Sequence, residues 1–152
     1  DRQAVMVLGT HFDINSYANE TRVKTTLLEG SVRVNALRPG TEPDLNGTVL
    51  KPNQQSVLTS GTISVQNVEG AYEIAWKNGF FMFNYENLEQ VMMKISRWYD
   101  IDVRYEDEDV KQQIFLGTVS RFENISKVLN MLEKTGNVKF RIEGKIVKIS
   151  KK

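Results

Sequence analysis

The 152-residue sequence contains no cysteine, three prolines and a single histidine. The absence of cysteine excludes disulfide bonds and thiolate metal sites, although it does not distinguish a reducing cytoplasm from an extracytoplasmic compartment. A strong charge of either sign is also missing, because 20 basic residues oppose 19 acidic ones. Proteins that bind nucleic acid or anionic membranes normally carry a basic surface, so other proteins or neutral ligands are the expected partners.

Long hydrophobic runs are absent as well. No apolar stretch approaches the ~20 residues that a membrane-spanning helix needs. The first residues, Asp1-Arg2-Gln3-Ala4, lack the charged and apolar regions of a signal peptide. The sequence therefore describes either a cytosolic protein or an excised soluble piece of a longer one. Its 40% apolar and 26% charged content is typical of a globular protein with one or two domains.

Short alternating runs separated by turn residues fill residues 5–68, and no helical period occurs among them. Asn46-Gly47 is the strongest hairpin signal, because both central residues of a type I′ turn need positive φ. Strands this short suit a small sandwich, barrel or β-solenoid. A strand so close to the start suggests that the β-domain continues upstream. The expected strands are 5–8, 11–16, 23–28, 31–35, 48–51, 56–59 and 62–66.

Two copies of a helix-then-strand unit follow, at residues 85–106 and 122–143. Tyr85-Glu86-Asn87-Leu88 aligns with Phe122-Glu123-Asn124-Ile125, and residues 101–106 align with 138–143. Asn87 and Asn124 are the expected N-caps, and Gln90 stands at the third helical position of the first copy. Each helix carries one apolar stripe, formed by Leu88, Val91, Met92, Ile95, Trp98 and Tyr99 in the first and by Ile125, Val128, Leu129 and Leu132 in the second.

The predicted fold class is mixed β and α+β. An all-β domain over residues 1–68, solenoid-like or sandwich-like and incomplete at its start, precedes a linker over 69–76. A duplicated domain over 77–152 has the element order βαβ–βαββ, with two helices on one face of a small sheet. Its second copy includes a strand over 114–119 and a helix that ends at Gly136, and a hairpin at Glu143-Gly144 leads into a strand over 145–150.

No catalytic, cofactor-binding or metal-binding pattern is found. His11 and Asp13 share one face of a strand and could act as base and orienter, but no serine or third ligand is placed near them by spacing. Two alternating polar residues indicate a solvated face. Asp107-Glu108-Asp109 lacks the alternate oxygen ligands of a calcium loop and is expected to be a charged turn. Phosphate-binding glycine loops and nucleophile elbows are absent too, so we expect no enzyme activity and no cofactor.

Two features are candidates for partner contact. Aromatic residues gather in the second half: Phe81, Phe83 and Trp98 are expected in the core and Trp76 at the domain junction, whereas Tyr99 and Phe80 are the most exposed candidates. The alternative is an aromatic surface for a protein or a glycan. The second feature is the strand over 145–150, since an unpaired edge accepts a strand from another protein, although edge lysines also discourage such pairing.

Several segments together resemble a known family. Val7-Leu8-Gly9-Thr10-His11-Phe12-Asp13-Ile14 and the stretches 23–34 and 50–59 resemble the periplasmic domain of FecR-type anti-sigma regulators. From Trp76 through Gly79, Phe83, Arg97-Trp98-Tyr99-Asp100 and Gly117 to residues 139–149, the chain resembles the C-terminal domain of Bacteroidetes members. That domain is similar to the short N-terminal domain of secretins and TonB-dependent transporters. The resemblance implies a β-solenoid-like first half and agrees with the repeat.

The resemblance implies a role in cell-surface signalling and transcription regulation. FecR-like proteins are single-pass inner-membrane regulators. Their cytoplasmic segment binds an extracytoplasmic-function sigma factor, and their periplasmic part receives a signal from the N-terminal domain of an outer-membrane TonB-dependent transporter. This chain is expected to be the periplasmic receiver, without the sigma-binding segment and the membrane helix. The expected contact residues are Tyr99, Arg104, Arg141, Lys145, Val147 and Ile149.

Two alternatives stay open. A glycan or siderophore sensor would use Tyr99, Phe80 or Trp76, and a structural domain of an outer-membrane assembly would oligomerise through the α/β half. Arg104 and Glu106 recur as Arg141 and Glu143, which predicts the same polar pattern on the exposed face of both strands. The copies differ where Trp98-Tyr99 stands against Thr135-Gly136, and the partner is expected near that difference.

Overall fold

The computed structural model describes residues 3–7, 9–18, 20–37 and 46–152. The chain divides into two compact units, Asp1–Ile74 and Ala75–Lys152, which we call the first and second unit. Between the strands and the unit boundary lies a one-turn helix, α1 (Gly70–Glu73), within the segment for which a linker is predicted. Leu8, at the end of the expected strand 5–8, lies outside the described residues.

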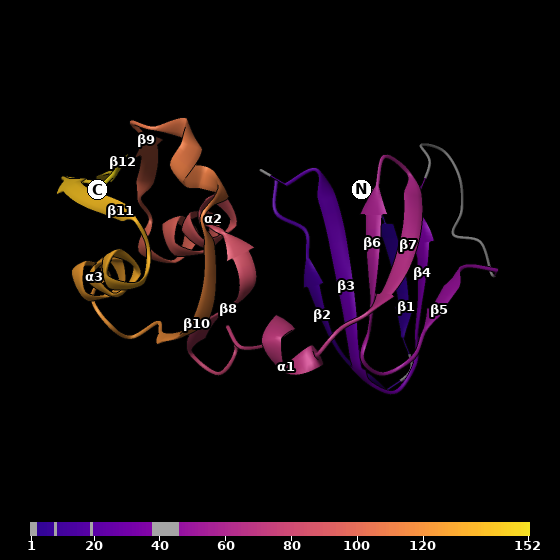
Figure 1. Ribbon diagram of the computed structural model, residues 1–152. Helices are drawn as coiled ribbons and strands as arrows, with labels where there is room; N and C mark the ends of the chain where they lie inside the picture. The colour runs from indigo at the N-terminus through magenta and orange to yellow at the C-terminus, as the bar shows by residue number, and fades with distance from the viewer. Residues whose placement is uncertain (1–2, 8, 19, 38–45) are drawn as a thin grey trace. The chain divides into compact units, whose positions relative to one another are not determined.

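The first unit consists of two antiparallel sheets, one with the strand order β2-β3-β6-β7 and one with the order β1-β4-β5 (Figure 1). Leu27 of β3 forms a core cluster with Val32 and Val34 of β4 and Leu50 of β5, so both sheets contribute to one core. The all-β architecture predicted for residues 1–68 is therefore confirmed over the described part of that range, and α1 follows it. The strands are β1 (Gln3–Val7), β2 (His11–Asn15), β3 (Arg22–Glu29), β4 (Val32–Ala36), β5 (Thr48–Leu50), β6 (Gln54–Thr59) and β7 (Thr62–Asn67).

The tight hairpin of this unit is not the one that the sequence favours most. Ser60 and Gly61 have φ values of 49° and 81°, and they join β6 to β7 directly after the Thr59–Thr62 pair. Gly47 lacks the positive φ that a type I′ turn at Asn46-Gly47 requires. The prediction of a hairpin turn there is wrong, because β4 and β5 are linked by residues 37–47, which is too long for a two-residue turn.

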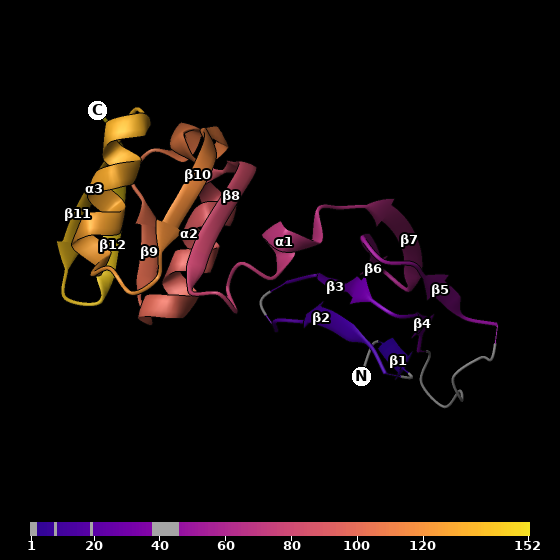
Figure 2. The same cartoon turned by 90° about the horizontal axis from the view of Figure 1, so that it is seen from below.

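The second unit follows the predicted order βαβ–βαββ, with a short 3₁₀ helix between the copies. Its strands form two sheets instead of the predicted single one, because β8 pairs with β10 while β9 pairs with β12. Figure 2 shows β8 beside β10 and α3 beside β11. The elements are β8 (Phe80–Asn87), α2 (Leu88–Tyr99), β9 (Asp102–Tyr105), η1 (Glu108–Gln112), β10 (Ile114–Ser120), α3 (Ile125–Thr135), β11 (Val138–Glu143) and β12 (Ile146–Lys151).

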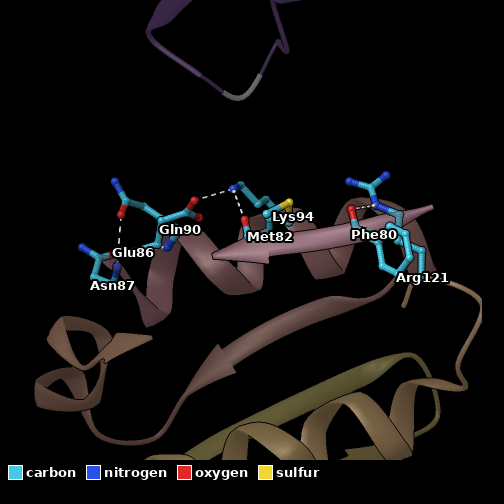
Figure 3. Close-up of polar contacts among 7 residues, drawn as sticks. All are labelled: Phe80, Met82, Glu86, Asn87, Gln90, Lys94 and Arg121. Carbon is cyan, nitrogen blue, oxygen red and sulfur yellow. Dashed lines mark hydrogen bonds and ion pairs between the residues drawn. The ribbon is translucent and has the colours of Figure 1, made fainter. Parts of the chain in front are cut away.

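Both helices begin at the predicted caps. The Asn87 side chain accepts a hydrogen bond from the Gln90 N–H at 2.9 Å, and the Gln90 side chain accepts one from the Asn87 N–H at 3.1 Å (Figure 3). Asn124 likewise accepts from the Lys127 N–H at 3.0 Å. Side-chain caps of this kind satisfy N–H groups that lack a partner in the first helical turn. The repeat is therefore visible in the structure as two equivalent helix starts.

One core joins both helices to both sheets of the second unit. Phe81 and Phe83 are buried in it, as predicted, and their stacked rings have centres 6.1 Å apart. Trp98 is not buried: 45% of it is exposed, because its indole N–H reaches the carbonyl of Arg121 at the surface. The remaining buried members are Leu88, Val91, Met92, Ile95, Val110, Phe115, Val119, Val128, Leu129, Leu132, Val138, Val147 and Ile149. Across the described residues, none of the helices has both the length and the apolar character to span a membrane.

Candidate protein-interaction surface

Arg121 lies in the loop after β10 and is fixed from three sides. Its Nε–H donates to the Phe80 carbonyl at 3.1 Å, as Figure 3 shows. Its guanidinium carbon lies 4.6 Å from the centre of the Phe81 ring and 5.0 Å from that of Trp98. A guanidinium over an aromatic face is attracted by the negative potential of the ring. Arg121 therefore holds the end of α2 against the start of β8.

Trp98 and Tyr99, at the end of α2, contact the backbone of the same loop. The Trp98 indole N–H donates to the Arg121 carbonyl at 2.9 Å, and the Tyr99 hydroxyl donates to the Glu123 carbonyl at 2.6 Å. Burial raises the pKa of Tyr99, the negative charge of Glu123 raises it further, and Arg121 opposes both. The phenol thus stays a neutral hydrogen-bond donor. Partial burial of Tyr99 fits the expectation from the sequence, but its hydroxyl is directed to the protein's own backbone.

The side chains around Arg121 form an exposed aromatic surface. Phe80 is 43% exposed, Trp98 45% and Phe122 83%. We call Phe80, Trp98, Tyr99, Arg121 and Phe122 the aromatic corner. Neither Arg121 nor Phe122 is among the site residues predicted from the sequence. The available signal was the alignment of Phe122 with Tyr85, since both aromatic residues precede a helix cap and lie outside its apolar stripe.

Gly79 shapes this corner. Its φ is +78°, and a Cβ atom at this position would overlap the ring of Phe122. Gly79→Ala is therefore expected to displace the Phe122 ring and to destabilise the second unit by about 1–2 kcal/mol, mainly through the left-handed backbone. Urea unfolding followed by circular dichroism measures this change. The double variant Gly79→Ala/Phe122→Ala separates the backbone strain from the ring overlap. We expect it to stay destabilised, because the left-handed backbone remains. Full recovery of stability would show instead that the ring overlap alone was responsible.

Three of the predicted contact residues are charged and exposed, as expected for surface positions. Arg104 of β9 and Arg141 of β11 flank Lys148 of β12 in register, which makes a row of three cations across the outer face of the sheet. Arg141 is paired with Glu106 at 2.9 Å and with Glu143 at 3.3 Å. A hydrogen bond from Lys148 lowers the pKa of Glu143, and the charges of Arg141 and Arg104 add to this. The cations are largely compensated by these carboxylates.

Lys145 lies in the turn between β11 and β12. Its ammonium group contacts the Asp100 carboxylate at 2.5 Å. This hydrogen bond lowers the pKa of Asp100 and raises the pKa of Lys145. The structure therefore connects Lys145 to the residue that follows Tyr99, whereas Arg104 and Arg141 lie on the separate outer face of the three-stranded sheet.

The prediction that Val147 and Ile149 contact a partner is wrong. Val147 and Ile149 are 0% exposed and belong to the core of the second unit. β12 is also not an edge, because it pairs with β11 on one side and with β9 on the other. An alternating strand such as 145–150 has one apolar face whether it lies at an edge or in the middle of a sheet, so the sequence pattern did not distinguish the two positions.

Tyr105 of β9 has a strongly raised pKa. Burial raises its pKa to about 12, with the carboxylates of Glu89 and Glu108 adding to the effect. The ammonium of Lys111 lies 4.8 Å from the ring centre. Because Tyr105 is half-buried and its unfolded value is 10.0, its neutral form supports folding fully below pH 10, and this support is lost as the pH rises toward 12.

This shift predicts a specific alkaline behaviour. The free energy of unfolding of the unmodified chain should decrease between about pH 10 and pH 12. Tyr105→Phe is expected to make this decrease smaller, by a few tenths of a kcal/mol up to about 1 kcal/mol after allowance for solvent screening. Urea unfolding at neutral and alkaline pH measures it. Tyr85→Phe removes an exposed phenol and is the matched control; equal alkaline curves for the two variants would contradict the assignment.

The candidate catalytic and metal residues form no such site. The His11 ring contacts Glu29 at 2.9 Å and both side chains are exposed. The acidic stretch Asp107-Glu108-Asp109 runs into η1, and Glu108 pairs with Lys111 at 2.6 Å. Among the described parts of the chain, no cluster of three or more histidine, aspartate or glutamate residues could hold a metal ion.

The comparison with protein families agrees with this architecture. Residues 80–149 match the family model described as FecR, C-terminal. These residues form a FecR C-terminal domain. The match covers both copies of the repeat and the whole aromatic corner, so the resemblance seen in the second half of the sequence is confirmed. The Bacteroidetes subtype stays a prediction.

Solved structures extend the similarity over both units. Two crystal structures of a candidate anti-sigma factor from Parabacteroides distasonis ATCC 8503, at 1.65 and 2.50 Å resolution, superpose with TM-scores of 0.80 and 0.78. Each is 22% identical, and the similarity covers 99% of this chain and 68% of theirs. At this identity the likeness is one of fold. Among curated proteins, none matches the sequence significantly.

Proposed function

We propose that this chain is the periplasmic, signal-receiving part of a transmembrane anti-sigma regulator. It binds the N-terminal signalling domain of an outer-membrane TonB-dependent transporter, and the state of that transporter is relayed to an extracytoplasmic-function sigma factor through segments outside this sequence. The observation that supports this most is the FecR C-terminal domain at residues 80–149, with an exposed aromatic corner on it.

The aromatic corner has the properties of a protein-binding surface. Tryptophan, tyrosine and arginine are the residues that most often dominate binding energy at interfaces. Here Arg121 is fixed between Phe81 and Trp98, and Trp98 is fixed by its bond to the Arg121 carbonyl. Side chains that are ordered before binding lose less conformational entropy when a partner covers them. The corner therefore offers rigid apolar area with little ordering cost.

A regulatory role without catalysis agrees with the family, which is regulatory. The sequence contains no motif that would supply a nucleophile, a base and its orienter. We propose that the chain works by binding alone and requires no cofactor. Its contribution to signalling is then a difference in affinity between two states of its partner.

Titration calorimetry with the cognate transporter's N-terminal domain tests the proposal. Saturable binding of one partner domain per chain is expected. The N-terminal domain of an unrelated transporter is the control, and it should give only heats of dilution. No binding of the cognate domain up to high micromolar concentration would contradict the proposed function.

A direct sensor of a glycan or siderophore is the second candidate, because Trp76 is 50% exposed in addition to Phe80 and Trp98. Aromatic faces on a surface bind sugar rings and aromatic chelators through the same apolar contacts. Both tryptophans are exposed, so a bound ligand should change the intrinsic fluorescence. A fluorescence response to the transported nutrient in the absence of transporter would favour the sensor over the receiver.

A further inference from the structure

The two-stranded sheet of the second unit has two outer edges, one on β8 and one on β10. The Arg121 N–H donates to the Gly79 carbonyl and the Leu88 N–H to the Gln113 carbonyl, each at 2.8 Å. These bonds fix which backbone groups of β8 and β10 point toward the partner strand. In an antiparallel pair, backbone groups point alternately toward and away from the partner strand. The backbone groups of Phe80 and Met82 on β8 therefore point outward, as do those of Ile114, Leu116, Thr118 and Ser120 on β10.

The β8 edge is closed by cationic side chains. The Lys94 ammonium donates to the outward carbonyl of Met82 at 3.3 Å and is held there by Glu86 at 2.5 Å. Arg121 covers the next outward carbonyl, that of Phe80. Figure 3 shows both cations along this side of the strand. β8 also contains a bulge with one extra residue. The bulge lies next to Tyr85, whose φ is +52°. Charged side chains and bulges are the devices by which proteins protect sheet edges from pairing.

The β10 edge lacks both devices. From Gln113 to Ser120 the chain contains no charged residue, and Ile114 and Leu116 are 58% and 61% exposed. Across the described residues, no side chain bonds to the backbone of residues 114–119. At the β11 edge, by comparison, Glu133 accepts the outward N–H of Phe140 at 2.6 Å. The outer edge of β10, a seven-residue, uncharged and partly apolar strand, is thus free to pair, whereas the outer edge of β8 is covered.

We infer that two copies of this chain pair through their β10 strands, antiparallel about a twofold axis. A register centred on Gly117 places Leu116 opposite Thr118 of the second copy and Ile114 opposite Ser120, so that outward backbone groups meet and no like charges oppose each other. The product is a four-stranded sheet with the order β8-β10-β10-β8. A sheet of two strands is marginal by itself, and extension to four strands stabilises it.

The closed β8 edge is the reason to expect a second copy of this chain as the pairing partner of β10. After pairing, both outer edges of the enlarged sheet are β8 strands, each covered by Lys94 and Arg121. These covered edges cannot pair with further strands. The association therefore ends at a closed dimer instead of growing into a fibre. The pairing uses β10 and does not require the transporter, so it can be tested separately from the proposed function.

Sedimentation velocity of the whole chain, from low to high micromolar concentration, tests the inference. A concentration-dependent dimer is expected. The variants Leu116→Lys/Thr118→Lys and Leu116→Glu/Thr118→Glu each place like charges opposite one another and should weaken the dimer about tenfold or more. An equimolar mixture of the two should restore dimers, because opposite charges then face each other. Ser126→Lys/Asn130→Lys, on the side of α3 that faces β11, adds the same charge and should leave the dimer intact.

Hydrogen exchange on the unmodified chain gives a measurement that does not depend on variants. Exchange of the Thr118 amide should slow as the concentration increases, whereas that of Met82 should not change. A sedimentation profile of monomer at the highest concentration, or dimers that persist in both charge variants, would overturn the inference. Slower exchange at Met82 instead of Thr118 would overturn it as well, because β8 would then be the pairing strand.

Discussion

Ile149→Lys is expected to unfold the second unit. Ile149 is fully buried on β12, the middle strand of its sheet, where it contacts the common core of both helices. An ammonium group at this position loses its hydration without gaining an ion pair, which costs several kcal/mol. Since whole domains are stable by only about 5–15 kcal/mol, most of the unit's stability is removed. Loss of the helical circular dichroism signal measures the effect, because α2 and α3 lie in this unit.

Lys148→Ala is the matched control on the same strand. Lys148 points to the opposite, outer face, where it pairs with Glu143 at 2.5 Å. Removing a surface ion pair of this kind costs about 1 kcal/mol or less, so the variant should stay folded. If Ile149→Lys also stayed folded and only weakened partner binding, β12 would be a contact strand after all.

Phe122→Ala is expected to weaken binding of the transporter's N-terminal domain by about 2 kcal/mol, or about thirtyfold in Kd, while the fold is kept. Phe122 is 83% exposed, so its removal costs little core packing. It is also the most exposed member of the aromatic corner and therefore the most accessible to a partner. Trp98→Ala should weaken binding similarly and also destabilise the corner, because the indole N–H bonds to the Arg121 carbonyl. Calorimetric titration of each variant gives the change in Kd.

The repeat supplies the control for this prediction. Tyr85 occupies the position in the first copy that Phe122 occupies in the second, and it is 73% exposed. Tyr85→Ala removes a comparable aromatic side chain outside the aromatic corner, and binding should stay close to that of the unmodified chain. Equal losses for Tyr85→Ala and Phe122→Ala would mean that the corner is not the contact surface. Binding that is unchanged by Phe122→Ala and Trp98→Ala together would exclude the corner directly.

The helices of the second unit were predictable because their signals are local. Asn87 and Asn124 stand at equivalent positions before two apolar stripes, and each caps the helix that follows it. A cap and a 3.6-residue period act within a few residues, so sequence alone contains them. Strand pairing is different, since alternation shows which face of a strand is apolar but not which strand lies beside it. For this reason one expected sheet became two, and residues 145–150 were placed at an edge.

The burial of aromatic residues shows the same limit. Phe81 and Phe83 alternate along one strand and were expected in the core, where they lie. Trp98 continues the apolar stripe of its helix by spacing, but it is 45% exposed and its indole bonds to a loop 23 residues further along the chain. Helical period alone does not show which residues of a stripe the rest of the fold covers.

The sequence by itself determined the duplicated helix-and-strand order, the caps and most of the apolar stripes, because each depends on neighbouring residues. Tertiary structure alone decided the placement of β12 between β11 and β9, the closure of the β8 edge and the assembly of the aromatic corner. In that corner Arg121 bonds to Phe80 across 41 residues and lies over Phe81 and Trp98. Contacts over such separations depend on how the two copies pack against each other, and no local pattern in the chain specifies them.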